Sequence, residues 1–420
     1  MRCLPDGLTG AIMALEGIPD AAVMLHGPGG CRTHHAVLAT AVSGKGDDGI
    51  EFWEPYYYGY PEVPATFLEE ADFINGAYAR SVDGLRTVSG RSPSIVVVID
   101  SPGAALIGDD HDSAIAEAGL AGIAFRMREP QASVPATEGC DHALAEVMRF
   151  LSPERRSPRP GTVNLIGLSM MDRDWAAARD ELCGYLEDMG LEVACCPGAG
   201  SDVASLVRSV DSELNVVVCP EQCRELSEWY ASMDVPSVAS PAGAPVGLDA
   251  LEAWIRAVAD ASGRDPSAAL DRVRGCRIRL RDKLAGLRYG VLRIRGLTFS
   301  VAAPASVARP LAEWLYGYMA MIPEAVSVDP GSDPDQAEAL RSFLESKGLG
   351  RAWGREPEEC GAVLADCVTA VTMASSGMCR EGIPITYASL GLDDIIPRPV
   401  YGIAGALYIL DEVFHGTRGM

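Results

Sequence analysis

The sequence lacks several patterns that quickly assign a chain to a common class. No run of about 18 uncharged apolar residues occurs along its 420 residues, so we expect no membrane span. The P-loop pattern G-x-x-x-x-G-K-[ST] is absent, which argues against ATP hydrolysis by this chain. No G-x-G-x-x-G follows a predicted strand, so we also expect no NAD or FAD site in the usual strand-to-helix turn.

Basic residues are scarce relative to acidic ones. The chain has 35 Lys and Arg against 58 Asp and Glu, which gives a formal net charge of −23. A surface this acidic repels phosphate backbones and anionic lipids, so neither nucleic acid nor a membrane is an expected partner. The opening residues Met-Arg-Cys-Leu-Pro-Asp show neither the basic nor the apolar region of a secretory signal. We therefore expect a cytoplasmic protein.

Cysteine, by contrast, is plentiful, with 12 residues. The cytosol keeps thiols reduced, so disulfides are not expected. Neither a C-x-x-C pair nor the tight ferredoxin spacing occurs. If these cysteines hold an iron–sulfur cluster, its ligands must come together from distant segments or from two chains.

Short apolar runs alternate with helical stretches along the whole chain. Most runs are apolar or β-branched along their length, as strands buried on both faces are. One helical stretch, 171–190, places Trp175, Leu182 and Leu186 on one face and stops at Gly190. This alternation predicts an α/β fold of doubly wound parallel sheets. The predicted strands are 21–25, 94–99, 122–125, 163–166, 191–194, 214–218, 299–303, 325–328 and 383–387.

Two breaks divide this alternating pattern. A proline-rich, charged stretch covers 152–161, and a basic stretch covers 272–295. Since the chain is too long for one ordinary core, we predict three Rossmann-like domains. They are an N-terminal domain over 1–155, a second over 160–285 and a third over 286–420.

The sharpest local motif is a buried strand that runs into His26-Gly-Pro-Gly-Gly-Cys31. Glycines allow the backbone to approach an inorganic ligand and leave N–H groups free to point at it. Cys31 then opens a predicted helix, whose N-terminus favours negative charge such as that of a thiolate. The same motif is also compatible with a simple strand–turn–helix corner that buries a free cysteine.

Two further segments extend this candidate site. Cys3 lies in a terminal segment that would fray unless it is held, and it is followed by a predicted helix over 8–16 that leads into the Cys31 strand. The loop 100–110, which contains Ser101, leaves the predicted carboxyl end of strand 94–99. Open α/β sheets bind their ligands at that edge.

Taken together, these motifs resemble the nitrogenase component 1 family over essentially the whole chain. Cys3 with Gly7-Leu-Thr-Gly10, and His26-Gly-Pro-Gly-Gly-Cys31, are similar to its first two cluster-cysteine motifs. Ser101-Pro-Gly-Ala-Ala-Leu-Ile-Gly-Asp-Asp110 is similar to its third. Weaker similarities lie in 72–85, 163–167, 245–249 and 398–406. The resemblance implies Cys3 and Cys31 as cluster ligands, three Rossmann-like domains, and a separate ATP-hydrolysing iron protein that supplies electrons.

One departure from the family concerns the third cysteine position, which is Ser101 here. An alkoxide is a poorer iron ligand than a thiolate, so Ser101 is a weak ligand or, as we favour, none. Two thiolates per chain, doubled across a two-fold axis, supply the four that a 4Fe–4S cluster needs. We therefore expect a subunit-bridging cluster in a homodimer, or in a heterodimer or heterotetramer with a paralogous subunit.

A second departure concerns the active-site metal of the family. The strand that ends at Cys219 resembles the one whose cysteine anchors the nitrogenase cofactor, but the histidine that would complete the anchor is missing near Ser389. Dinitrogen reduction is therefore not expected. Cys219 could hold a second metal centre, together with Cys195, Cys196 and Cys223; the reading we favour is a set of buried thiols without a metal.

For three other features we favour a structural interpretation over a catalytic one. The aromatic segment 52–60 could cover a flat organic substrate, but it fits a dimer interface better. His34 and His35 could deliver protons, although histidines beside a motif are more often structural. Asp109 and Asp110 fit hydrogen bonding to a loop or a helix N-terminus.

Three functions remain open at this point. The leading one is a nitrogenase-like reductase component that takes electrons from an iron protein and reduces a bound substrate. The others are a scaffold for metallocluster assembly and a non-catalytic paralogous subunit of a nitrogenase-like complex. No motif in the sequence names the substrate.

Overall fold

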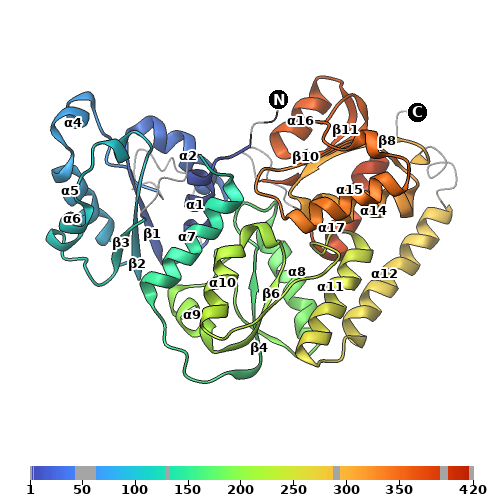
Figure 1. The fold of residues 1–420 in the computed structure, drawn as a ribbon, viewed down its shortest axis with the longest axis horizontal. Helices are drawn as coiled ribbons and strands as arrows, with labels where there is room; N and C mark the ends of the chain where they lie inside the picture. The colour runs from blue at the N-terminus through green and yellow to red at the C-terminus, as the bar shows by residue number, and fades with distance from the viewer. Residues whose placement is uncertain are drawn as a thin grey trace.

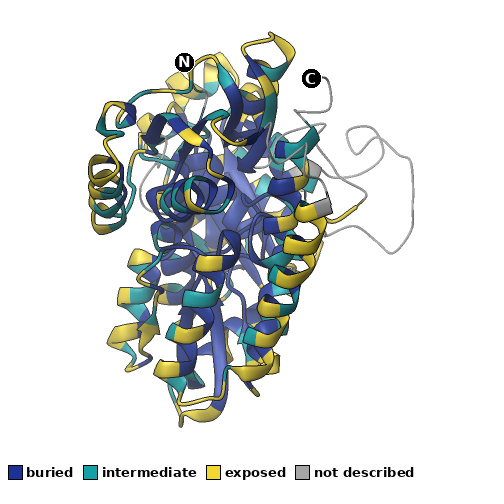
Figure 2. Ribbon diagram, turned by 90° about the vertical axis from the view of Figure 1, so that its right-hand side faces the viewer, coloured by how far each residue is buried: buried dark blue, intermediate teal, exposed yellow. Residues whose placement is uncertain are grey.

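The computed structural model describes residues 2, 4–42, 63–127, 133–286, 294–387 and 396–415. The protein is α/β, with three parallel sheets that follow one another along the chain, each flanked by helices (Figure 1). The sheets form the buried interior, and exposed residues gather on the outer faces of the helices (Figure 2). Within these residues no helix is both long and apolar enough to cross a membrane.

The first sheet has the order β1-β2-β3 and is built on two fully buried strands. Alternate residues of these strands face opposite layers: Val23 and Val97 pack towards α1 and α7, whereas Met24 and Val98 pack towards α5 and α6. Helices thus cover both faces, as the continuous apolar runs predict. The strands are β1 (Ala21–His26), β2 (Ile95–Asp100) and β3 (Ala124–Arg126); the helices are α1 (Gly7–Glu16), α2 (Gly29–Val42), α4 (Glu70–Asn75), α5 (Tyr78–Ser89), α6 (His111–Glu117) and α7 (Ala136–Leu151).

The second sheet has the order β5-β4-β6-β7, so the chain reverses its direction of winding next to β4. The carboxyl ends of β4 and β6 therefore border a crevice of the kind that binds ligands in open α/β sheets. The strands are β4 (Arg159–Ile166), β5 (Glu192–Cys195), β6 (Ser212–Val217) and β7 (Ser237–Val238); the helices are α8 (Trp175–Asp188), α9 (Val203–Arg208), α10 (Arg224–Ser232), α11 (Gly247–Ser262) and α12 (Ser267–Gly286).

The third sheet has the order β11-β10-β8-β9 and reverses its winding next to β8. Its carboxyl edge therefore has a second crevice between β8 and β10. The strands are β8 (Thr298–Ala303), β9 (Ile322–Val328), β10 (Cys360–Asp366) and β11 (Cys379–Thr386); the helices are α14 (Ala305–Met319), α15 (Pro334–Ser346), α16 (Cys367–Ser375) and α17 (Gly402–His415).

Neighbouring sheets share their hydrophobic cores. One cluster joins Val23 of β1 to Val217 of β6, and another joins Leu165 of β4 to Val301 of β8. The three units are therefore packed against one another, and the edges of their sheets can contribute to common sites.

The predicted fold class is confirmed, because all three sheets are parallel and lie between helices. Each predicted strand overlaps an observed one, and the helix expected over 171–190 is α8. Two strands, β7 and β10, were not predicted from the sequence. β4 begins at Arg159, inside the stretch expected as a linker. The domain boundaries at 155–160 and 285–286 stay a prediction.

Candidate functional site

The Cys31 motif folds as a strand, a tight turn and a helix. β1 is buried along its whole length and ends at His26. The chain then turns at Gly27 and Pro28, and α2 begins at Gly29. Cys31 lies in the first turn of this helix, where its N–H donates to the Pro28 carbonyl at 3.1 Å. Its thiol is only partly buried, so it lies at the surface of the chain rather than in the core.

Ser101 lies against the same turn. A Cβ placed on Gly27 would be 2.6 Å from Ser101 Oγ, 2.9 Å from Ser101 Cβ and 3.8 Å from Cys31 Cβ. Only glycine fits where the loop after β1 meets the loop after β2 so closely. The structure thus brings two of the predicted site residues, Cys31 and Ser101, together beside one glycine.

The Ser101 side chain has a structural role in its own loop. It is fully buried, and its Oγ accepts a hydrogen bond from the Ala104 N–H at 3.4 Å, at the start of the short 3-10 helix Ala104–Leu106. The Ser101 N–H in turn donates to the His26 carbonyl at 2.9 Å. These bonds hold the two loops together, whether or not an iron atom contacts the hydroxyl.

Cys3 lies outside the described residues, but its neighbour Arg2 contacts the third sheet. The Arg2 guanidinium lies 2.6 Å from Asp329 and 3.1 Å from Asp366, and it donates to the Ala302 carbonyl at 3.2 Å. Asp329 follows β9 and Asp366 ends β10. The N-terminal segment is therefore fixed to the carboxyl edge of the third sheet.

A buried polar network supports the Cys31 turn from below. Nε2 of His26 lies 3.1 Å from Asp109 Oδ2, and Nδ1 lies within 3.2 Å of the hydroxyls of Thr66 and Ser81. Thr66 also accepts from the Gly27 N–H at 3.0 Å. Burial, together with the nearby His111 ring, lowers the pKa of His26, which is therefore neutral at pH 7. Hydrogen bonds thus tie the end of β1 to Thr66, Ser81 and Asp109.

Asp110 and His35, near the same motif, also make hydrogen bonds within the first unit. Asp110 caps α6, because its carboxylate accepts from the Ser113 N–H at 3.0 Å. His35 is buried beside Thr9 and Asp6, with Nδ1 3.2 Å from the Thr9 hydroxyl. His34 is exposed and packs edge-on against the His35 ring.

Cys219 lies at the junction of the second and third sheets. It follows β6, is fully buried, and its Sγ lies 3.2 Å from Glu221 and 3.6 Å from the Ser306 hydroxyl at the start of α14. Burial, with Glu221 and Asp172 close by, raises the pKa of the Cys219 thiol well above its ordinary value. The side chain is therefore a protonated thiol that donates to a carboxylate.

A small cavity beside Cys219 is lined by residues of both the second and the third unit. Its volume is about 10 Å³, enough for roughly one water molecule. Asp172 lines it and accepts from the Tyr401 hydroxyl at 2.9 Å, while burial raises the pKa of Asp172 to about 6. A carboxyl of this kind can hold or release a proton near neutral pH. A multi-iron cluster does not fit this space with its lining as it stands.

The three other cysteines that the sequence grouped with Cys219 lie in hydrophobic cores. Cys195 and Cys223 pack in the cluster shared by the first and second sheets, and Cys196 packs in the cluster shared by the second and third. None of the three lines the cavity beside Cys219. The aromatic segment 52–60 and the position of Ser389 lie outside the described residues.

Two groups of residues at the strand ends were not predicted. One is the set of Arg2, Asp329 and Asp366, which joins the N-terminus to the third sheet. The other is the pair of Asp100 and His111, whose side chains meet at 2.8 Å beneath the Cys31 turn. Only the position of Asp100 and Asp366 at strand ends could have indicated them, because each contact depends on the fold.

Comparisons with known proteins agree with this geometry. The family model for nitrogenase component 1 type oxidoreductases matches residues 7–413. The chain is 28% identical over 268 residues to the nitrogenase iron-molybdenum cofactor biosynthesis protein NifE of Methanococcus maripaludis. This alignment covers 60% of this chain and 50% of that protein. The chain is 34% identical over 123 residues to one subunit of the light-independent protochlorophyllide reductase of Rhodospirillum rubrum, covering 27% and 21% of the two chains.

The chain thus spans about half the length of one of these relatives and about a fifth of the other. A solved structure described as nitrogenase Cp1 at pH 6.5 superposes with a TM-score of 0.77 at 16% identity, over 99% of this chain and 93% of that one. A second, described as nitrogenase Cp1 at pH 5, gives 0.72 at 14% identity. At this level of identity the likeness concerns the fold alone.

Proposed function

Because this chain belongs to the family of nitrogenase component 1 type oxidoreductases, we propose that it is a nitrogenase-like reductase component. In this proposal it accepts electrons from a separate ATP-hydrolysing iron protein through an iron–sulfur cluster and reduces a substrate bound between its units. Its partners are a second chain of the same type, either a copy or a paralogue, and the iron protein. The three proposed domains are 1–155, 160–285 and 286–420.

The observation that carries this proposal is the position of Cys31. Its partly buried thiol lies in the first turn of α2, at the end of the helix that favours negative charge. The turn follows the paired carboxyl ends of β1 and β2, and Gly30, next to the cysteine, faces open space, because nothing lies within 4 Å of a Cβ placed there. Both features suit a sulfide-rich, negatively charged group.

The donor set fits a cluster that two chains share. Within the described residues, Cys31 is the one thiol at this site, and Cys3 follows the anchored Arg2 in the sequence. We propose Cys3 and Cys31 of each of two chains as the four thiolates of one 4Fe–4S cluster, without Ser101. Such a cluster, when bound, takes up and passes on single electrons. The role of this chain is to hold it at an exposed edge that a partner can reach.

We propose no second metal centre at Cys219. Its thiol donates to Glu221, burial keeps it protonated, and the adjacent cavity has room for about one water molecule. A metal ligand must instead be a deprotonated thiolate. Asp172, in the same cavity, is a group that can hold a proton for a reduction step.

A scaffold for metallocluster assembly is the second candidate. The similarity to NifE, which is described as a cofactor biosynthesis protein, extends over 60% of this chain and favours it. A scaffold releases its cluster to an acceptor protein, whereas a reductase keeps it and consumes electrons. The replacement of the third family cysteine by Ser101 is compatible with a third role, a non-catalytic paralogous subunit.

The first experiment measures iron and acid-labile sulfide per dimer, with EPR after dithionite reduction, on anaerobically purified protein. Wild type should contain about four irons per dimer. Cys31→Ala should lose them, and Cys183→Ala, which removes another partly buried thiol, should keep them. Wild type without iron, or iron that survives Cys31→Ala, would contradict the cluster.

A second measurement separates the reductase from the scaffold. The reduced iron protein and ATP are added, and the EPR signal of the bound cluster is followed. Reduction with retention of iron supports the reductase. Transfer of iron and sulfide to an apo-acceptor, without reduction by the iron protein, supports the scaffold.

A further inference from the structure

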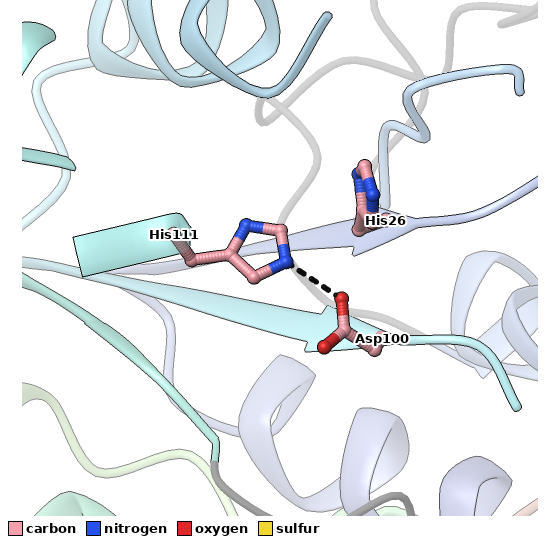
Figure 3. A group of neighbouring side chains, drawn as sticks. All are labelled: His26, Asp100 and His111. Carbon is pink, nitrogen blue, oxygen red and sulfur yellow. Dashed lines mark hydrogen bonds and ion pairs between the residues drawn. The ribbon is translucent and has the colours of Figure 1, made fainter. Parts of the chain in front are cut away.

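Two histidines and an aspartate meet in the buried network beneath the Cys31 turn. His26 ends β1, Asp100 ends β2 at the directly paired position, and His111 opens α6. All three are buried, and one ligand atom from each lies within 4.8 Å of the others (Figure 3). The ends of two strands and the start of a helix thus converge at the carboxyl edge of the first sheet.

We propose that His26, Asp100 and His111 form a binding site for one divalent transition-metal ion of the zinc type. Two imidazoles and one carboxylate are ligands that such ions accept, and a water molecule can supply a fourth position. The site is separate from the proposed cluster and does not depend on it, because no cysteine contributes. Its role is structural: the ion fastens the ends of β1 and β2 to α6 beneath the loops that carry Cys31 and Ser101.

The surroundings of these ligands resemble those of metal sites. The carboxylate of Asp109 lies 3.1 Å from His26 Nε2 and is itself held by the Ala77 N–H at 3.0 Å. A carboxylate on one imidazole nitrogen fixes the ring and its tautomer in metal centres. Arg126 binds Oδ2 of Asp100 at 2.8 and 3.1 Å, which orients this carboxylate and leaves Oδ1 facing His111.

The charge of the pocket also suits a cation. Asp100 and Asp109 carry two negative charges against the single positive charge of Arg126. The formal charge of the pocket is therefore −1 before a divalent ion binds and +1 afterwards.

One buried ring nitrogen of this network lacks a hydrogen-bond partner among the described residues. Nε2 of His111 is 2.8 Å from Asp100 Oδ1, but Nδ1 of the same ring is buried and has no hydrogen-bond partner among the described residues. Buried polar atoms of this kind are rare and often mark an ion or water. The rings of His26 and His111 lie edge to face with centroids 4.7 Å apart.

The test uses full-length protein in the Cys31→Ala background, so that the proposed cluster cannot contribute metal. Metal-free protein is titrated with Zn²⁺ and with Co²⁺, and the bound ion is counted by elemental analysis. One ion per chain is expected, and bound Co²⁺ should show ligand-field absorption without the thiolate charge-transfer band that a cysteine site produces. The unfolding temperature should rise when Zn²⁺ is added.

His111→Gln and Asp100→Asn are the test variants, because each keeps a hydrogen-bonding side chain of similar size. Each should weaken Zn²⁺ binding by about tenfold or more and abolish the rise in unfolding temperature, while the far-ultraviolet circular dichroism stays that of the parent. His415→Gln is the control, since His415 belongs to the partly exposed group with Asp411 and Glu412. No ion bound by the folded parent, or binding that these variants leave unchanged, would overturn the proposal.

Discussion

The guanidinium of Arg2 lies 2.6 Å from the carboxylate of Asp329. This pair joins the second residue of the chain to the end of β9, and the contact of Arg2 with Asp366 joins it to the end of β10. All three side chains are at least 92% buried, so the pair is shielded from solvent. Arg2, which precedes Cys3 in the sequence, is therefore anchored to the third sheet.

Replacing Arg2 should weaken both the fold and the cluster. Arg2→Gln leaves two carboxylates buried without a cation, and we expect a loss of about 3–5 kcal/mol in unfolding free energy by urea denaturation. Iron per dimer should fall as well, although no proposed ligand is changed. Arg341→Gln removes an exposed pair with Glu345 and should cost less than about 1 kcal/mol. Full iron content in Arg2→Gln would show that cluster binding does not depend on the contacts of Arg2 with the third sheet.

Gly27→Ala tests the close approach of the two loops. The added Cβ would lie 2.6 Å from Ser101 Oγ, so the loops must move apart, at a cost of about 1–3 kcal/mol and with loss of iron. Gly30→Ala is the matched control, because nothing lies within 4 Å of its Cβ position.

A second substitution checks the cause of this effect. Both atoms nearer than 3.0 Å to the added Cβ belong to the Ser101 side chain. Gly27→Ala combined with Ser101→Gly should therefore recover much of the stability and the iron. Equal losses for Gly27→Ala and Gly30→Ala would contradict the steric argument.

The Cys31 turn could be predicted from the sequence because its signals are local. An unbroken apolar strand, three glycines and a cysteine lie within 11 residues. Such a pattern indicates a buried strand that ends in a tight turn. The parallel sheets could be predicted for the same reason. β10 was missed because it starts with Cys-Gly and contains two alanines, and β7 because it has only two residues.

The unpredicted parts of the site depend on contacts that no local pattern encodes. Arg2 meets Asp366 across 364 positions of the chain. His26, Asp100 and His111 come together only because β1 pairs with β2 in one register and α6 returns over the strand ends. A shift of one residue in that register would turn His26 or Asp100 to the other face of the sheet.

Ser101→Ala should leave the cluster in place. The hydroxyl contributes one hydrogen bond to the Ala104 N–H, so we expect a loss of about 0.5–1.5 kcal/mol and unchanged iron per dimer. Ser101→Cys restores the third thiolate of the family pattern and should change the EPR spectrum if the side chain reaches an iron. Iron lost from Ser101→Ala would identify Ser101 as a ligand.

Cys219→Ser tests the absence of a second metal centre. Serine keeps a hydroxyl that can donate to Glu221, so the variant should fold and should contain the same iron as wild type. The measurement is iron per dimer beside unfolding by urea. More than about four irons in wild type, with the excess lost in Cys219→Ser, would show a second cluster at this position.

Asp141 should make part of the stability depend on pH. Its carboxylate accepts from the N–H groups of Glu225 and Leu226 at 2.7 and 2.9 Å, at the start of α10. Burial nevertheless raises its pKa to about 6, above the value of about 3.9 in an unfolded chain. The folded state therefore binds the proton more tightly, and this contribution is full below about pH 3.9 and is lost as the pH rises through about 6.

Wild type should accordingly gain about 1 kcal/mol relative to Asp141→Asn when the pH falls from about 7.5 to about 5, measured by urea denaturation at each pH. Asp265→Asn is the control of opposite sign, because hydrogen bonds from Ser267 lower the pKa of the exposed Asp265. Relative to that variant, wild type should show no gain over the same range. A difference between wild type and Asp141→Asn that stays constant with pH would mean that the amide hydrogen bonds outweigh burial and keep Asp141 ionised.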